Sequence, residues 1–266
     1  MTRVAVVTGA ARGIGAATVR GLAARGWAVL AVDRCADDPA LPYRLGTREE
    51  LDRVVAGASA AAGDPGAVRA MTADVRDPAA MADAVAEAER RWGGLDAAVA
   101  VAGVIAGGVP LWEMDAAQQQ AVIDTDLGGV LTLARTAIPA LLRRPEPRNG
   151  RFLAVASAAA TRGLPMLAAY CAAKAGVAGL VRGLAAELGG TGVTANAVSP
   201  GSTDTPILAE SARLYGLPGA QSFAAQQPAR RLLTPEEVAA ALVWLAGTGS
   251  SAMTGAVVPV DGGLAL

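Results

Sequence analysis

Tyr170 and Lys174 stand four residues apart in the segment AAYCAAK (168–174), a spacing that places both side chains on one face of a helix. Lys174 is the only lysine among 23 basic residues, and the chain contains no histidine. An ammonium group beside a phenol lowers the phenol's pKa, so that the tyrosine can take a proton from an alcohol near neutral pH. The pair therefore predicts proton transfer at an alcohol oxygen, with a chemically inert pair on a helix surface as the alternative.

A glycine-rich segment, TGAARGIG (8–15), lies between an apolar run and a helical pattern. Gly9, Gly13 and Gly15 would let the backbone turn sharply and approach a pyrophosphate, which the amides at a helix N-terminus can bind. The same glycines also suit an ordinary tight turn. Asp33 ends the next apolar run, 18 residues past Gly15, where a carboxylate commonly meets the hydroxyls of a ribose. The combination predicts a bound dinucleotide.

The charges around this segment bear on the choice of dinucleotide. The Asp33 carboxylate would repel a 2′-phosphate, which favours NAD over NADP. Arg12 and Arg34 could instead meet that phosphate, so NADP stays open as the alternative. Asp74 ends the third apolar run, where it could accept from the adenine amino group or cap the helix that follows.

Short apolar runs alternate with longer amphipathic ones along the whole chain. This pattern predicts a parallel sheet covered by helices on both faces. We expect a doubly wound Rossmann fold in the α/β class, with a seven-stranded sheet in one domain over residues 1–266. The predicted strands are 4–8, 27–33, 67–74, 95–103, 151–157, 192–199 and 255–263, and the predicted helices are 13–25, 47–62, 78–91, 114–143, 168–188 and 235–247.

Two segments, 35–51 and 199–233, are longer than connections in such a sheet need to be. Both follow strand carboxyl ends, where open parallel sheets bind ligands. The second is expected to be a long loop with one short helix, and its mostly apolar sequence favours a hydrophobic small molecule as substrate.

The bulk composition argues against several other classes of protein. A net charge of −1 gives no electrostatic attraction for nucleic acid or anionic membranes. Cys35 and Cys171 form no metal-binding spacing, so no metal site is expected. The first strand begins almost at the N-terminus, and no apolar run is predicted to span a bilayer. We expect a cytoplasmic protein.

Taken together, these motifs resemble the short-chain dehydrogenase/reductase family from Arg3 to the terminal DGG. The resemblance rests on TGxxxGIG, the acids ending strands two and three, AG after strand four, a serine 13 residues before YxxxK, and PGxxxT. It implies that Ser157 binds the substrate oxygen, Tyr170 transfers the proton and Lys174 holds the nicotinamide ribose. It also implies hydride transfer between NAD and a hydrophobic secondary alcohol or ketone, in a homotetramer. The cofactor residues that it implies are Gly9, Arg12, Gly13, Ile14, Gly15, Asp33, Arg34, Asp74, Val75, Ala102, Gly103, Tyr170, Lys174, Pro200, Gly201 and Thr205.

The chain departs from the family pattern at two places. After the fourth strand, the usual NNAG reads Ala100-Val101-Ala102-Gly103. In TDLGG, Asp126 occupies the position of the family's catalytic asparagine, which holds a water in a proton relay from the lysine. Asp126 is therefore a candidate catalytic residue. A tolerated spacer, a retuned relay and a catalytically silent NAD-binding protein all remain open.

The segment DRCADDPALPYRLGTREEL (33–51) resembles the insert of actinobacterial family members coupled to mycofactocin, including carveol-dehydrogenase-like enzymes. That resemblance implies an NAD that the insert covers and that is not freely exchanged. Electrons would then leave through the peptide-derived carrier mycofactocin. The alternatives are a passive surface insertion and an NADP-linked carbonyl reductase with the same triad.

Overall fold

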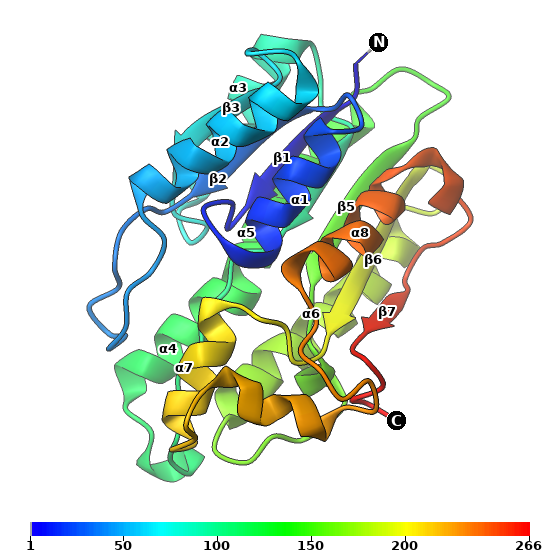
Figure 1. Cartoon of the computed structure of the whole chain (residues 1–266). Helices are drawn as coiled ribbons and strands as arrows, with labels where there is room; N and C mark the ends of the chain where they lie inside the picture. Colours follow the sequence, from blue (N-terminus) through cyan, green and yellow to red (C-terminus); the bar gives the residue numbers. More distant parts are fainter. Residues whose placement is uncertain (1) are drawn as a thin grey trace.

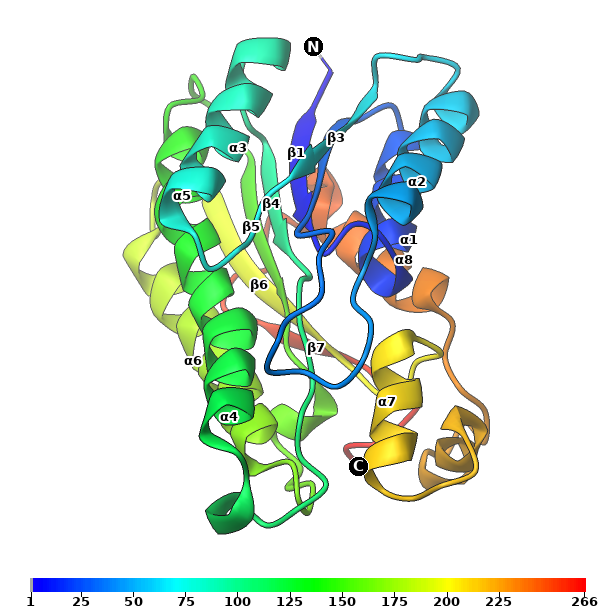
Figure 2. The same cartoon turned by 90° about the vertical axis from the view of Figure 1, so that its left-hand side faces the viewer.

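The computed structural model describes residues 2–266, in which seven parallel strands form one sheet with helices on both sides (Figures 1 and 2). The order across the sheet is β3-β2-β1-β4-β5-β6-β7. The predicted fold class is confirmed, and each predicted strand is present: β1 has the predicted bounds, β6 lies one residue later, and the others are shorter than predicted. The bounds are β1 (Val4–Thr8), β2 (Ala28–Asp33), β3 (Val68–Thr72), β4 (Ala97–Ala100), β5 (Gly150–Val155), β6 (Val193–Pro200) and β7 (Val257–Val260).

Two hydrophobic cores hold the helices against the sheet. Side chains alternate along a strand, so Val4 and Val6 of β1 join one core while Ala5 and Val7 join the other. The first core is covered by α3 (Pro78–Trp92), α5 (Gly129–Leu142) and α6 (Ala168–Glu187). The second is covered by α1 (Gly13–Ala23), α2 (Arg48–Ala62) and α8 (Pro235–Ala246). Figure 2 shows these two groups of helices on opposite sides of the sheet.

Side-chain caps determine where several helices begin. Thr47 and Glu50 form a reciprocal capping box that starts α2, and Thr234 with Glu237 does the same for α8. Asp77 accepts from the backbone N–H groups of Ala79 and Ala80 and so caps α3. Asp74 therefore does not cap α3, a role that its position in the sequence allowed.

The predicted helix 114–143 is divided in the structure into α4 (Ala116–Ile123), a π-helical turn (Asp124–Gly128) and α5. A π turn adds one residue to a helix and is frequent at functional sites. Here it contains Asp126, whose side chain is buried toward the sheet. The π turn that interrupts the predicted helix therefore contains a predicted site residue.

The carboxyl ends of the strands all point to one end of the molecule. The chain starts in the middle of the sheet at β1, runs to the β3 edge and returns to β4, so the strand order reverses between β1 and β4. Two long connections extend beyond this end (Figures 1 and 2). The loop 34–47, which we call the strap, joins β2 to α2, and the segment after β6 contains α7 (Pro206–Leu214) and a 3-10 segment (Ala220–Gln226). Among residues 2–266, no helix is long and apolar enough to cross a bilayer.

Candidate active site

A cleft of about 630 Å³ opens at the carboxyl ends of the strands, beside the reversal point between β1 and β4. Open α/β sheets bind their ligands at this place. The structure brings every predicted site residue to the wall of this cleft. They are Gly9, Arg12, Gly13, Ile14, Gly15, Asp33, Arg34, Asp74, Val75, Ala102, Gly103, Asp126, Ser157, Tyr170, Lys174, Pro200, Gly201 and Thr205.

The loop between β1 and α1 has the open backbone that a pyrophosphate requires. Gly9 has φ +65, and a Cβ there would lie 2.7 Å from the backbone nitrogen of Ala102. A Cβ on Gly15 would lie 2.0 Å from the carbonyl oxygen of Gly9. The glycines therefore allow close backbone packing that no larger residue permits, and the N-terminus of α1 faces the cleft.

The neighbouring wall of the cleft supplies a carboxylate suited to a ribose. Asp33 is held by backbone N–H groups, with Oδ2 accepting from Ala11 at 3.0 Å and Oδ1 accepting from Cys35 at 3.1 Å. Its side chain still lines the cleft. This end of the cleft therefore fits the adenosine part of a dinucleotide, and the glycine loop fits its phosphates.

The end of β4, where the family's NNAG asparagines are absent, is held by a hydroxyl from the neighbouring strand. The Thr8 hydroxyl, at the end of β1, accepts from the backbone N–H groups of Val101 and Ala102 at 3.1 and 3.3 Å. Gly103 follows, and a Cβ there would lie 3.3 Å from Asp126 Oδ2 and 3.4 Å from Lys174 Nζ. The glycine thus permits the backbone to pass close to this charged pair.

The predicted proton-transfer residues come from two elements that meet in the cleft. Ser157 follows β5, and Tyr170 and Lys174 lie one turn apart on α6. Lys174 Nζ donates to the Val155 carbonyl at 3.2 Å and lies 5.6 Å from the centre of the Tyr170 ring. Burial raises the pKa of Tyr170, while the charge of Lys174 and a hydrogen bond with Ser157 oppose that rise.

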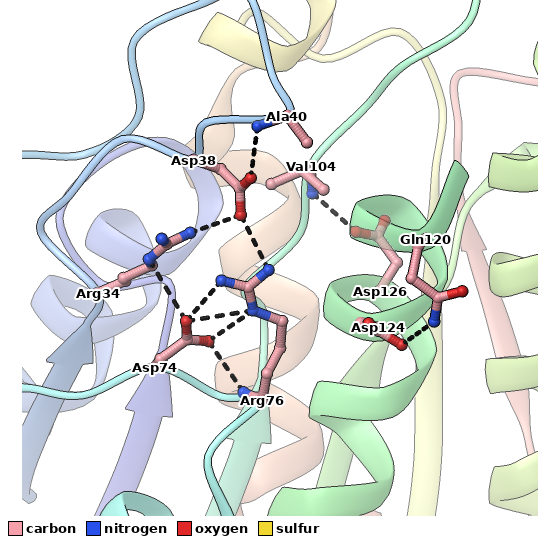
Figure 3. Close-up of polar contacts among 9 residues, drawn as sticks. All are labelled: Arg34, Asp38, Ala40, Asp74, Arg76, Val104, Gln120, Asp124 and Asp126. Carbon is pink, nitrogen blue, oxygen red and sulfur yellow. Dashed lines mark hydrogen bonds and ion pairs between the residues drawn. The ribbon is translucent and has the colours of Figure 1, made fainter. Parts of the chain in front are cut away.

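Asp126 reaches Lys174 from the π turn. Its Oδ2 lies 3.1 Å from Lys174 Nζ, its Oδ1 accepts from the Val104 backbone N–H at 2.7 Å, and the side chain is fully buried. Figure 3 shows Asp126 beside Val104. Burial raises the pKa of Asp126, against the opposing effect of Lys174. Burial alone would lower the pKa of Lys174, but Asp126 and Tyr170 hold it above its ordinary value.

The other half of the cleft is mainly apolar. It is formed by the loop after Ser157 and by the segment that contains α7, and Pro200, Gly201 and Thr205 lie at its border with the glycine loop. Beyond the adenosine end and the Asp126–Lys174 pair, Arg162 is the one charged side chain in the lining formed by residues 2–266. Its Nη1 donates to the Leu264 carbonyl at 2.7 Å. The apolar lining includes Leu164, Pro165, Leu167, Ile207, Leu208, Leu217, Phe223 and Leu264.

Residues of the strap fix it across this end of the molecule, and sequence reasoning did not identify them. The Tyr43 hydroxyl accepts from the Ile105 backbone N–H at 2.8 Å, and Leu41 and Leu45 pack in an apolar cluster with residues of α4 and α6. Arg12 donates to the Arg44 carbonyl at 3.0 Å. One feature of the sequence could have indicated these contacts: the apolar residues of PALPYRL differ from the polar composition of most surface loops.

Comparisons with known proteins agree with this geometry. The family described as Enoyl-(Acyl carrier protein) reductase matches residues 9–265. A cis-4-hydroxycyclohexanecarboxylate dehydrogenase of Sinomonas cyclohexanicum is 40% identical over 265 residues, which cover 98% of this chain and 96% of the relative. An uncharacterized NAD-dependent oxidoreductase of Mycobacterium tuberculosis is 34% identical, covering 98% of this chain and 95% of the relative.

Solved structures give the same result. Carveol dehydrogenase from Mycobacterium avium in complex with NAD superposes with a TM-score of 0.92 at 30% identity, covering 98% of this chain and 97% of that one. A short-chain dehydrogenase from Mycobacterium paratuberculosis bound to NAD gives a TM-score of 0.85 at 29% identity, covering 99% and 97%. With a family match over nearly its whole length, this chain belongs to the short-chain dehydrogenase/reductase family.

Proposed function

We propose that this protein oxidises a hydrophobic secondary alcohol to a ketone, or catalyses the reverse reaction, with NAD as its cofactor. One observation carries the proposal. Ser157, Tyr170 and Lys174 line the same cleft as the glycine loop and Asp33, which supports proton transfer beside a bound dinucleotide. Relatives and solved structures that are named for NAD support the choice of cofactor.

The residues in the cleft can carry out the proton half of this reaction. NAD, when bound, supplies the carbon that accepts the hydride, so the alcohol loses two electrons with that hydride. Ser157 and Tyr170 hold the alcohol oxygen, and Tyr170 takes its proton. Lys174 stabilises the phenolate by its charge, since its effect on the pKa of Tyr170 is downward. Its ammonium would also donate to the nicotinamide ribose.

Asp126 would act by keeping Lys174 charged and oriented. A buried lysine without a partner tends to lose its proton, whereas Asp126 and Tyr170 keep the pKa of Lys174 raised. The same carboxylate raises the pKa of Tyr170. Asp126 therefore makes the Tyr170 phenol harder to deprotonate and its neighbouring cation more persistent than an asparagine would. This favours a retuned relay over a passive spacer or a silent protein.

The substrate half of the cleft favours a cyclic alcohol that carries a carboxylate. Its lining is mainly apolar, and Arg162 supplies one cation that no carboxylate of residues 2–266 neutralises at ion-pair distance. A guanidinium is well shaped to bind a carboxylate with two parallel hydrogen bonds. The 40% identical relative is named for a hydroxycyclohexanecarboxylate, which combines an apolar ring with that group.

We also propose that NAD is held tightly and is re-oxidised through mycofactocin. The strap is fixed at two points, by Tyr43 to the backbone of Ile105 and by Arg12 to the backbone of Arg44. Release of a nucleotide beneath it would require these contacts to open, which slows dissociation. The resemblance of the insert to mycofactocin-coupled enzymes supports the choice of carrier.

We further propose one NAD-binding domain per chain and a homotetramer. All seven strands share one sheet, which supports the single domain. Helices α4, α5 and α6 would pair across a two-fold axis by analogy with the family. Leu131 on α5 is 45% exposed, which supports a contact on this side.

Native mass spectrometry of freshly purified protein tests these proposals together. We expect the mass of four chains with one nucleotide each, and heat should release that nucleotide as NAD. Protein that arrives empty and then binds NADPH in preference to NADH would contradict both tight retention and NAD specificity. A monomer with bound NAD would contradict the tetramer alone.

A further inference from the structure

Three arginines line the adenosine end of the cleft, where a ribose 2′-phosphate would lie. Arginine is the residue that most often binds a phosphate with paired hydrogen bonds. From the sequence, two of them, Arg12 and Arg34, left NADP open as the alternative to NAD. In the structure, however, each of them already has a partner. Arg12 donates to the backbone of the strap, and Arg34 and Arg76 belong to a closed network of charges.

The network alternates two arginines with two aspartates (Figure 3). Asp38 Oδ2 lies 2.7 Å from Arg34 Nη1 and 2.9 Å from Arg76 Nη1. Asp74 Oδ2 lies 3.3 Å from Arg34 Nε and 2.7 Å from Arg76 Nη2. The four formal charges cancel. One oxygen of Asp38, Oδ2, contacts both guanidinium groups and so bridges them.

Asp38 is built into this position by the strap. Its side chain is only 7% exposed, and its Oδ1 accepts from the Ala40 backbone N–H at 2.9 Å. Burial alone would raise the pKa of Asp38, but the hydrogen bonds from Ala40, Arg34 and Arg76 outweigh it and hold the pKa below its ordinary value. The carboxylate is thus ionised at neutral pH. Unlike Asp33 and Asp74, it is absent from the cleft wall, so it acts on a ligand through the arginines.

We propose that Asp38 is the residue of the strap that makes the site select NAD over NADP. By holding Arg34 and Arg76, it withdraws the two guanidinium groups that a 2′-phosphate would need. A 2′-phosphate would then enter a region whose four-residue network is neutral and whose wall also carries the Asp33 carboxylate. The inference rests on the proposed dinucleotide site and adds a positioning residue from the strap, outside the glycine loop and the end of β2.

Substitution of Asp38 tests this selectivity without any substrate. Asp38→Asn keeps the side-chain shape and the acceptor for Ala40 but leaves a net positive charge on the network. The dissociation constants of NAD⁺ and NADP⁺ are measured by calorimetry on protein freed of nucleotide with charcoal. We expect the ratio Kd(NADP⁺)/Kd(NAD⁺) to fall about tenfold, the effect of one charge-assisted hydrogen bond.

Two further variants separate charge from strap mobility. Asp37→Asn is the matched control, because Asp37 lies on the same strap and pairs with Arg44 at 3.1 Å, away from the network. It should leave the ratio unchanged. Asp38→Asn combined with Arg34→Gln should cancel most of the gain in NADP⁺ binding, since the freed cation is then gone.

Other outcomes would overturn the inference. Equal weakening of both dinucleotides by Asp38→Asn would mean that Asp38 only tethers the strap. An equal fall in the ratio with Asp37→Asn would mean that strap mobility, and not the network, controls selectivity. If the unaltered protein binds neither dinucleotide, the proposed function itself fails, which this measurement reveals before any variant is compared.

Discussion

Asp126 Oδ2 and Lys174 Nζ lie 3.1 Å apart, and both side chains are buried from solvent. The family's asparagine at this position is neutral, so this chain has an additional negative charge beside its lysine. The π turn and Gly103 make room for it, because a Cβ on Gly103 would lie 3.3 Å from the carboxylate. An ion pair at this depth is a chemical difference from the family and has measurable consequences.

Asp126→Asn should move the pH dependence of alcohol oxidation to lower pH. Asp126 raises the pKa of both Tyr170 and Lys174, so its neutralisation lowers both. The acid limb reports the phenol that must lose its proton, and the alkaline limb reports the ammonium that must keep it. Both limbs of the kcat–pH profile should therefore shift downward. A profile that does not move would show that the carboxylate is only a spacer.

Lys174→Arg should abolish most turnover while the fold is retained. The buried ammonium donates to the Val155 carbonyl at 3.2 Å and lies 3.1 Å from Asp126 Oδ2. A larger, planar guanidinium cannot make these contacts in the same space beside Tyr170. We expect kcat/KM to fall about 100-fold or more, the usual contribution of a positioned proton-transfer group. Circular dichroism checks the fold, and Arg182→Lys on the exposed side of α6 serves as the control. A near-normal rate would overturn the assigned role.

Tyr43→Phe should speed the release of bound nucleotide. It deletes the acceptor of the Ile105 backbone N–H, a loss of about 1–3 kcal/mol for a buried donor. If that contact keeps the strap closed, the dissociation rate of NADH, followed by its fluorescence after addition of excess NAD⁺, should rise about tenfold or more. Tyr215→Phe removes a hydroxyl that donates to Pro165 near the substrate half and should leave the rate unchanged. Equal rates in all three proteins would show that the strap does not control release.

Arg162→Gln should raise KM for a hydroxy acid and leave KM for a neutral alcohol nearly unchanged. Its guanidinium is the one cation in the substrate half of the cleft among residues 2–266. With cis-4-hydroxycyclohexanecarboxylate, we expect kcat/KM to fall about tenfold or more, mainly through KM. With cyclohexanol the same substitution should change little. A similar loss with both alcohols would mean that Arg162 supports the loop rather than binding the substrate.

The sheet and the cleft could be predicted because their signals are local in the sequence. Continuous valine and alanine runs mark strands that are buried on both faces, and Gly9 and Gly15 mark a backbone with no space for side chains. YxxxK is also local, since one helical turn places Tyr170 and Lys174 together.

The contacts that hold the strap and the division of the long helix could not be predicted, because they depend on interactions between distant segments. Asp38 meets Arg76 across 38 positions, and Tyr43 meets Ile105 across 62. Asp38 and Arg76 each resemble an ordinary surface residue when considered alone. The π turn arises where Asp126 must reach Lys174 and Val104, and periodicity in residues 114–143 carries no sign of that requirement.

The transfer of deuterium from substrate to nucleotide tests the central claim most directly. The protein is incubated with NAD⁺ and cyclic secondary alcohols deuterated at the carbinol carbon, and the nucleotide is then released by heat and weighed by mass spectrometry. We predict deuterium in the nicotinamide ring with the unaltered protein and none with Tyr170→Phe. Nucleotide without deuterium in the unaltered protein, or equal labelling in the two proteins, would contradict the account.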